Sequence, residues 1–167
     1  MAQKRNVLFL CTHNSSRSQM AEAFLRKYAG DRFNVYSAGL DPTEVHPMTR
    51  QVMHEVGLDL DDRHAKGVQT YLGKLLVSYL IVVCETANSR CPHSWPGSEI
   101  QKRLFWPFDD PVAAEGSEEE RLQKFRQVRD QIEQQIKTWV KEISEHEDEA
   151  NHKQTKEAAE DSVSVHP

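Results

Sequence analysis

The sequence predicts an α/β fold in which a four-stranded parallel sheet carries helices on both faces. Short apolar segments alternate along the chain with segments whose apolar residues recur at helical spacing, and this alternation is typical of parallel sheets. The run Tyr79–Cys84 is apolar throughout, as a strand buried on both faces requires. Reactive residues follow the predicted strands at Cys11, Cys84 and Asp110, where the functional loops of such a sheet gather.

The first half of the chain contains two predicted strand–helix units. Val7–Leu10 is the first strand because it is wholly apolar, and apolar spacing predicts the first helix over Ser18–Tyr28. Val35–Ala38 is the second strand. Pro47 suits the first turn of the second helix, and Gly57 ends that helix. The apolar positions of the second helix are Met48, Val52, Met53 and Val56.

The second half contains two more strands and a long helix. Tyr79–Cys84 is the third strand, and Leu104–Trp106 is a shorter fourth strand. In Ser117–Glu120 a serine is followed three residues later by a glutamate, which is the capping-box pattern of a helix start. This last helix carries one apolar stripe, formed by Leu122, Phe125, Val128, Ile132, Ile136, Val140 and Ile143.

Length and composition limit the possible classes of protein. The 167 residues suit a single catalytic domain, expected over residues 1–144, and the charged residues 145–167 are expected to form a disordered tail. The net charge of -5 argues against a general nucleic-acid binder. Three cysteines do not suit a secreted disulfide framework, and no apolar run approaches the roughly 20 residues of a membrane span. We therefore expect a cytoplasmic monomer with reduced thiols.

The most informative segment is Cys11–Ser18, a cysteine followed six residues later by Arg17, between a strand and a helix. Such a loop directs backbone N–H groups at one point, and the helix dipole adds positive potential there. Arg17 offers a planar fork to two oxygens of a tetrahedral oxyanion. The same field should lower the pKa of Cys11 and make it a nucleophile. The residues expected to bind the oxyanion are Thr12, His13, Asn14, Ser15, Ser16, Arg17 and Ser18.

These motifs resemble the low-molecular-weight phosphatase fold and, more narrowly, the thioredoxin-coupled arsenate reductases. The similarity extends in order over residues 5–143. It is carried by Val7–Glu22, Val35–Gly39, His46–Pro47, Glu55–Asp59, Val82–Cys84, Cys91–Pro92, Phe108–Pro111, Gly116–Glu120 and Phe125–Asp130.

The resemblance implies that three cysteines reduce arsenate to arsenite. Cys11 would attack arsenate, and the residue directly before proline, Asp110 rather than Asp109, would protonate the departing hydroxide. Cys84 would attack the sulfur of Cys11 and release arsenite, and Cys91 would attack Cys84, leaving a disulfide that thioredoxin reduces. No tightly bound cofactor is expected, and phosphate and sulfate would compete with arsenate for the loop.

The chain departs from the family pattern at two positions. Many relatives carry a further cysteine where this chain has Ser16. Some relatives bind potassium through residues that match Asn14, Glu22 and Ser37 together with an aspartate, and this chain has Lys66 at the aspartate position. Because an ammonium group there could replace the cation, no metal is predicted.

Two other functions compete with the reductase interpretation. A phosphotyrosine phosphatase would use Cys11, Arg17 and Asp110 in the same roles, but Val112 stands where such relatives place a tyrosine. A non-catalytic oxyanion sensor would not need an intact nucleophile, arginine and acid. The second and third cysteines also admit a plain structural role, since free cysteine is often buried.

Overall fold

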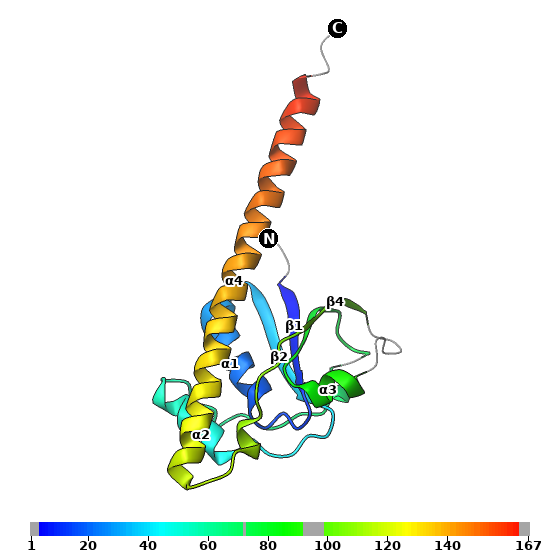
Figure 1. Ribbon diagram of the computed structural model, residues 1–167. Coiled ribbons are helices and arrows are strands. Elements are labelled where there is room, and N and C mark those ends of the chain that lie inside the picture. Colours follow the sequence, from blue (N-terminus) through cyan, green and yellow to red (C-terminus); the bar gives the residue numbers. More distant parts are fainter. Residues whose placement is uncertain (1–3, 72, 92–98, 164–167) are drawn as a thin grey trace.

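Four parallel strands form one sheet at the centre of the molecule (Figure 1). The computed structural model describes residues 4–71, 73–91 and 99–163 of the chain. The strand order is β2-β1-β3-β4, so the chain starts in the middle of the sheet at β1, goes to one edge at β2, returns to the middle at β3 and ends at the other edge with β4. The strands are β1 (Arg5–Cys11), β2 (Phe33–Gly39), β3 (Val77–Val82) and β4 (Ile100–Phe105). This arrangement confirms the predicted α/β class and its parallel four-stranded sheet.

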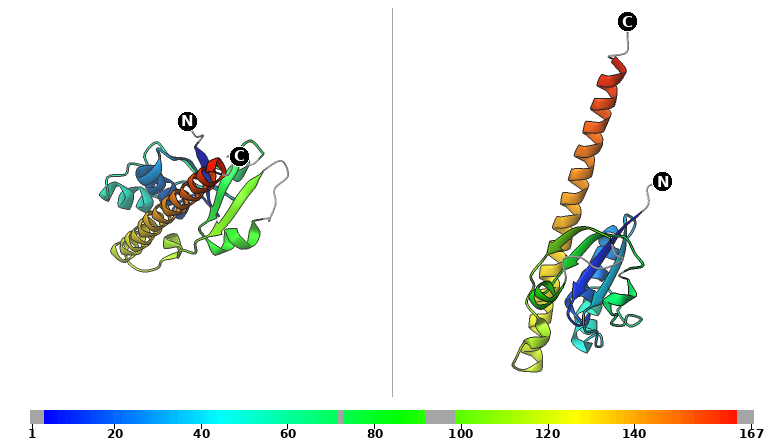
Figure 2. Two further views of the ribbon diagram at one scale, coloured as in Figure 1. Left: turned by 90° about the horizontal axis from the view of Figure 1, so that it is seen from above. Right: turned by 90° about the vertical axis from the view of Figure 1, so that its right-hand side faces the viewer.

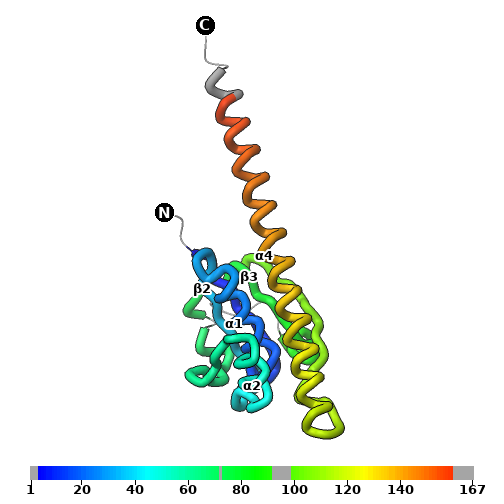
Figure 3. Tube along the Cα trace, turned by 90° about the vertical axis from the view of Figure 1, so that its left-hand side faces the viewer, coloured from blue at the N-terminus to red at the C-terminus, as the bar shows by residue number. Residues whose placement is uncertain are grey.

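Helices cover the sheet from two sides. Helix α1 packs against β1, β2 and α4, while α2 packs against α4, so these three helices form one layer (Figures 1 and 3). Helix α3 contacts β1 and β3 and lies on the opposite side of the sheet from α1 (Figure 2). The helices are α1 (Arg17–Ala29), α2 (Pro47–Glu55), α3 (Glu85–Arg90) and α4 (Glu118–Val163).

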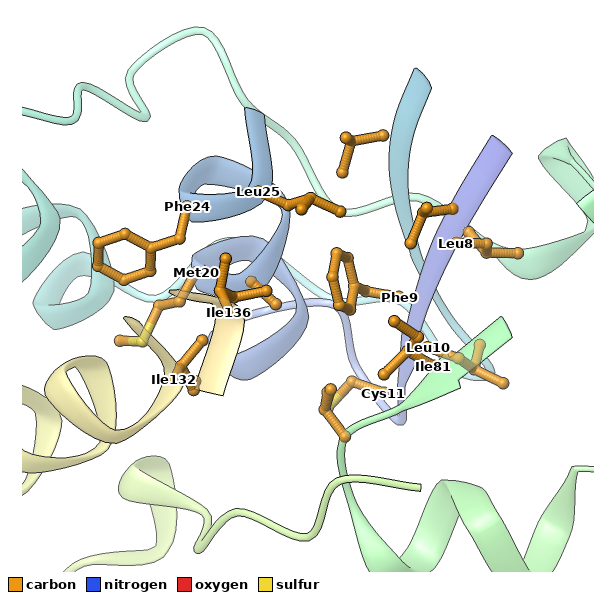
Figure 4. Close-up of a cluster of buried hydrophobic side chains, with 14 of the residues drawn as sticks. Leu8, Phe9, Leu10, Cys11, Met20, Phe24, Leu25, Ile81, Ile132 and Ile136 are labelled. Carbon is orange, nitrogen blue, oxygen red and sulfur yellow. The ribbon is translucent and has the colours of Figure 1, made fainter. Parts of the chain in front are cut away.

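The hydrophobic core lies between the sheet and the layer of α1, α2 and α4. Figure 4 shows Phe9 of β1 extending toward Met20 of α1 and toward Ile132 and Ile136 of α4, and all four side chains are fully buried. On the predicted stripe of α4, the first five side chains are buried, and the last two are partly buried against the core. The apolar stripe therefore fixes how α4 packs on the domain.

All four strands differ from the predicted ones at their ends, and β1 and β2 extend beyond the predicted apolar runs on both sides. Cys84 was expected to close the third strand, but β3 ends at Val82 and Cys84 is the N-cap of α3. The fourth strand begins at Ile100, earlier than predicted, and excludes Trp106. The apolar pattern missed its first residues because β4 lies at the sheet edge and exposes polar side chains there.

The end of α4 is a correction to the sequence prediction. Residues 145–163 were expected to be disordered, but they continue α4 away from the sheet (Figure 1). The segment contains glutamate, alanine and lysine, which favour helices, and it contains no glycine or proline, so nothing in it interrupts a helix. Residues 164–167 of the predicted tail lie outside the described residues, and the domain boundary at residue 144 stays a prediction.

Across residues 4–163, leaving aside the two internal gaps, no helix combines the length and the hydropathy that a membrane span needs.

Candidate active site

The sheet topology brings Cys11 and Cys84 together. Cys11 is the last residue of β1, and Cys84 follows the end of β3, which is the neighbour of β1 in the sheet. Since parallel strands end at the same edge, both side chains lie beside the loop that joins β1 to α1. Arg17 is the first residue of α1, so the strand, loop and helix predicted around Cys11 are present.

Asn14 braces the loop from within. Its φ of 52° is the left-handed conformation, which asparagine adopts more readily than most residues. Its Nδ2 donates to Ser18 Oγ (2.8 Å) and Ser37 Oγ (3.0 Å), and its Oδ1 accepts from Gln19 Nε2 (2.9 Å) and the Lys66 N–H (2.9 Å). The fully buried amide thus uses both its nitrogen and its oxygen to hold the loop in place.

Gly39 allows the loop to lie directly against the end of β2. A Cβ atom at this position would come within 2.8 Å of the Asn14 nitrogen and the Thr12 carbonyl oxygen. Both are backbone atoms, which cannot move aside without distorting the loop. The glycine at the end of the second strand is therefore a requirement of the site, although in the sequence it stands out only as the last residue of a stretch that carries the family resemblance.

The loop carbonyls turn away from the face where an anion would bind. Four of them accept hydrogen bonds from the segment that follows β2, a contribution that the sequence motif does not reveal. In a trans peptide the N–H points opposite the carbonyl, so the matching N–H groups are left for an anion. The bonds run from Leu40 N–H to Cys11 O (3.2 Å), Asp41 N–H to Thr12 O (2.7 Å), Thr43 N–H to His13 O (3.1 Å) and His46 N–H to Ser15 O (3.0 Å).

Arg17 supplies the charge of the site. Its Nη1 donates to the Phe108 carbonyl oxygen (2.9 Å), which fixes the guanidinium next to the loop that carries Asp110. Arg17 Nε and Ser16 Oγ are buried and have no hydrogen-bond partner among the described residues. Buried donors normally find a partner, so this pair suits a ligand with several acceptor oxygens.

The two neighbouring aspartates face different partners. Asp110 Oδ2 lies 3.7 Å from Arg17 Nη2, and Asp110 Oδ1 accepts the Val112 N–H (3.0 Å). Asp109 instead forms an ion pair with Lys124 of α4 (2.9 Å) at the exterior. The structure thus places Asp110, and not Asp109, at the anion loop.

Other side chains of the loop lie around this centre. The Thr12 hydroxyl is within hydrogen-bond distance of Cys84 Sγ (3.3 Å). The His13 ring is exposed, and its Nδ1 contacts the Asp41 carbonyl oxygen (3.0 Å). Ser15 is half-buried. The histidine ring therefore belongs to the rim of the site, while its N–H, which bonds the Cys11 thiol, belongs to the interior.

The charge within the thiol pair differs from the sequence expectation. A hydrogen bond from Cys11, together with the Thr12 hydroxyl and the Ala87 N–H (3.3 Å), lowers the pKa of Cys84 to about 5. The hydrogen bond to Cys84 and burial raise the pKa of Cys11, and they outweigh the lowering effect of Arg17. The two thiols therefore share one proton through their hydrogen bond. The pKa of Cys11 is raised in the ligand-free site, so the low value expected from the anion loop alone is not found while Cys84 lies against it.

This charge distribution predicts a thiolate absorbance step in acid solution. The absorbance near 240 nm should rise as the pH increases through about 5, because a group with a depressed pKa loses its proton there. The step should keep its midpoint in Cys91→Ser, which serves as the matched control. It should shift in Cys84→Ser, because the remaining Cys11 thiol loses the partner that raises its pKa and keeps Arg17 and the His13 N–H, which lower it. An unchanged midpoint in Cys84→Ser would contradict the hydrogen bond between the two thiols.

Cys91 lies apart from the other two cysteines. It ends α3, its N–H donates to the Ala87 carbonyl oxygen (2.8 Å), and its side chain is buried. Cys84 and Cys91 lie at opposite ends of this helix, and a helical rise of 1.5 Å per residue separates them by about 10 Å. A disulfide needs Cα atoms within about 7 Å, so α3 must change shape before the two can bond. None of the three cysteines is part of a disulfide.

The side chains expected from the resemblance to match potassium ligands form a hydrogen-bonded cluster in this structure. Ser37 Oγ donates to Glu22 Oε2 (3.2 Å), and Arg26 pairs with Glu22 Oε1 (3.2 Å). Burial lowers the pKa of Lys66, while the Glu22 carboxylate opposes that shift. Among the described residues, no group of three or more histidine, cysteine, aspartate or glutamate side chains is arranged to hold a metal ion.

Comparison with known proteins identifies the family. A family model described as low molecular weight phosphotyrosine protein phosphatase matches residues 6–149. The chain belongs to this family. A curated arsenate reductase of Halalkalibacterium halodurans is 41% identical over 82% of the chain and 96% of its own length.

The fold is similar to solved structures of arsenate reductases. An arsenate reductase in a phosphate-binding state is 28% identical, with a TM-score of 0.65, over 83% of this chain and 98% of its own. A thioredoxin-dependent arsenate reductase of Corynebacterium glutamicum is 27% identical, with a TM-score of 0.60, over 86% of this chain and 63% of its own.

Proposed function

We propose that this chain is an arsenate reductase that uses three cysteines and receives electrons from thioredoxin. The observation that carries the proposal is the contact between Cys84 and Cys11 at the anion loop. Hydrolysis of a phosphate ester needs a nucleophile, an arginine and an acid, but no second thiol. Reduction of an arsenic(V) adduct, in contrast, requires a second thiol in contact with the first. The names of the relatives support the same assignment.

The first step forms a bond between Cys11 sulfur and arsenic. Arsenate binds to the loop N–H groups and to Arg17, whose buried Nε then gains an acceptor. The proton that the two thiols share passes to an oxygen of the bound anion, and the Cys11 thiolate attacks arsenic, while Cys84 is left as a thiolate for the second step. Hydroxide leaves with a proton from Asp110, as water. The product is arsenic(V) bound to Cys11.

The second step transfers two electrons. The Cys84 thiolate attacks Cys11 sulfur, a sulfur–sulfur bond forms, and the sulfur–arsenic bond breaks. The electron pair of the broken bond stays on arsenic, which leaves as arsenite after an oxygen takes up a proton. Phosphorus(V) in the same adduct does not accept this pair, so phosphate acts as a competitor. The first disulfide therefore joins Cys11 and Cys84.

The third step moves the disulfide outward. The Cys91 thiolate attacks Cys84 sulfur, which frees Cys11 for the next arsenate. Because Cys91 lies at the far end of α3, this step requires the helix to unwind. Thioredoxin then reduces the Cys84–Cys91 disulfide, its own two thiols supplying the electrons. Such a cycle suits the reducing cytoplasm, where we place the protein.

A coupled assay tests the function. With arsenate, thioredoxin, thioredoxin reductase and NADPH, the full chain should oxidise NADPH continuously, and Cys84→Ser should abolish this activity. Hydrolysis of p-nitrophenyl phosphate, measured in parallel, should be weak and should survive in Cys84→Ser. If arsenate fails to drive NADPH oxidation while phosphatase activity is strong, the family's phosphatase function replaces the proposal. Anion binding without either activity would instead identify an oxyanion sensor.

A further inference from the structure

Arg103 of β4 contacts the end of the helix that separates the two outer cysteines. Its Nη2 donates to the carbonyl oxygen and to the Oδ1 of Asn88, at 3.0 Å each, and its Nη1 donates to the Cys91 carbonyl oxygen at 3.3 Å. The guanidinium is partly buried. One side chain from the sheet thus binds the last turn of α3 through three hydrogen bonds.

These bonds depend on the helical conformation. The last carbonyl groups of a helix have no partner within it, and a positive charge at this end is favourable. The spacing of the two Arg103 nitrogens matches acceptors that only the folded α3 presents together. A Cys84–Cys91 disulfide requires the ends of α3 to approach each other, so it requires these contacts to be lost or rearranged.

We propose that Arg103 is a positioning residue that stabilises the dithiol form of α3 and thereby sets how readily the Cys84–Cys91 disulfide forms. This inference rests on the proposed function, because that disulfide is an intermediate of the relay. A second arginine, Arg90 on α3, pairs with Asp41 (2.6 Å), but both side chains are largely exposed. Solvent weakens such a pair, so the partly buried Arg103 carries the effect.

The equilibrium between the dithiol form and the Cys84–Cys91 disulfide can be measured against glutathione. Formation of the disulfide releases two electrons and two protons from the thiols, and glutathione disulfide accepts them to give two glutathione molecules. The full-length chain is equilibrated at a series of glutathione ratios, trapped with acid, and mapped by mass spectrometry for the Cys84–Cys91 bond.

Arg103→Ala should shift the equilibrium about tenfold toward the disulfide, since hydrogen bonds to a charged group are among the stronger ones. Tenfold corresponds to a midpoint potential about 30 mV more negative for a two-electron couple. Lys102→Ala, which removes the exposed neighbour on the same strand, is the matched control and should leave the midpoint within about twofold of wild type.

The outcomes separate the two proposals. If wild type forms no Cys84–Cys91 disulfide at any ratio, the relay fails and the role of Arg103 fails with it. If wild type forms the bond and Arg103→Ala has the same midpoint or a more positive one, the relay stands and the Arg103 proposal is overturned. A purely structural residue would lower the stability of both forms and leave the midpoint unchanged.

A second variant covers the case in which Arg103→Ala does not fold. Arg103→Lys keeps the charge but replaces the planar fork by a single ammonium, so it should shift the equilibrium in the same direction by about threefold. In the reduced protein, the Cys91 amide should also exchange with solvent faster in this variant than in Lys102→Ala. An unchanged midpoint in Arg103→Lys, with normal folding, overturns the proposal.

Discussion

Replacing Cys91 with serine is expected to stop the reaction after one turnover, with one arsenite released for each protein chain. Cys11 and Cys84 are already in contact, so the attack on arsenate and the release of arsenite can both proceed without Cys91. The resulting Cys11–Cys84 disulfide is buried, since less than 5% of either side chain is exposed. A thiolate of thioredoxin must reach the sulfur that it attacks, and steady-state turnover should fall at least about a hundredfold.

Rapid mixing of reduced Cys91→Ser with arsenate measures this burst. Arsenite should appear at a stoichiometry near one, and mapping should find Cys11 joined to Cys84. Cys84→Ser is the comparison, because it should release no arsenite at all. Sustained turnover of Cys91→Ser with thioredoxin would mean that the inner disulfide is accessible and that α3 need not unwind.

The site loop was predictable because its signals are local. The run Val7–Leu10 is apolar and Cys11 follows it directly. The loop after Cys11 leads into a helix whose first residue is Arg17. Parallel strands end at one edge, which predicted that Cys84 would lie on the same side of the sheet as Cys11, and the pairing of β1 with β3 places the two in contact. Asp110 was assigned through the family resemblance, and its contact with Arg17 supports that choice over Asp109.

The features that sequence reasoning missed depend on contacts between distant segments. Helix α3 is short and polar, and it contains no apolar stripe, so its packing and its bonds to Arg103 could not be read from periodicity. The pKa of Cys11 depends on a hydrogen bond to a thiol more than seventy residues away. The extension of α4 was missed because low hydrophobicity shows only that a segment is exposed to solvent. A charged exposed helix and a disordered segment both have this property.

Asp110→Asn should lower kcat for arsenate by about 10² to 10⁴, the range typical of a lost general acid. The amide cannot protonate the departing hydroxide, but it can still accept the Val112 N–H that Asp110 Oδ1 now accepts. The loop should therefore keep its conformation. Removal of a negative charge 3.7 Å from Arg17 should also leave KM for arsenate unchanged or lower it, because the arginine then interacts with the anion alone.

Asp109→Asn is the matched control for this change. It removes a charge from the adjacent residue, but only from an exposed ion pair with Lys124, so kcat should stay within about twofold of wild type. Single-turnover release of arsenite, measured for both variants, isolates the chemical steps from reduction by thioredoxin. If the two variants lose activity equally, the loss comes from the loop or its charge, and Asp110 is not the acid. A fall in kcat confined to Asp110→Asn, without a rise in KM, is the result that only loss of a transferable proton explains.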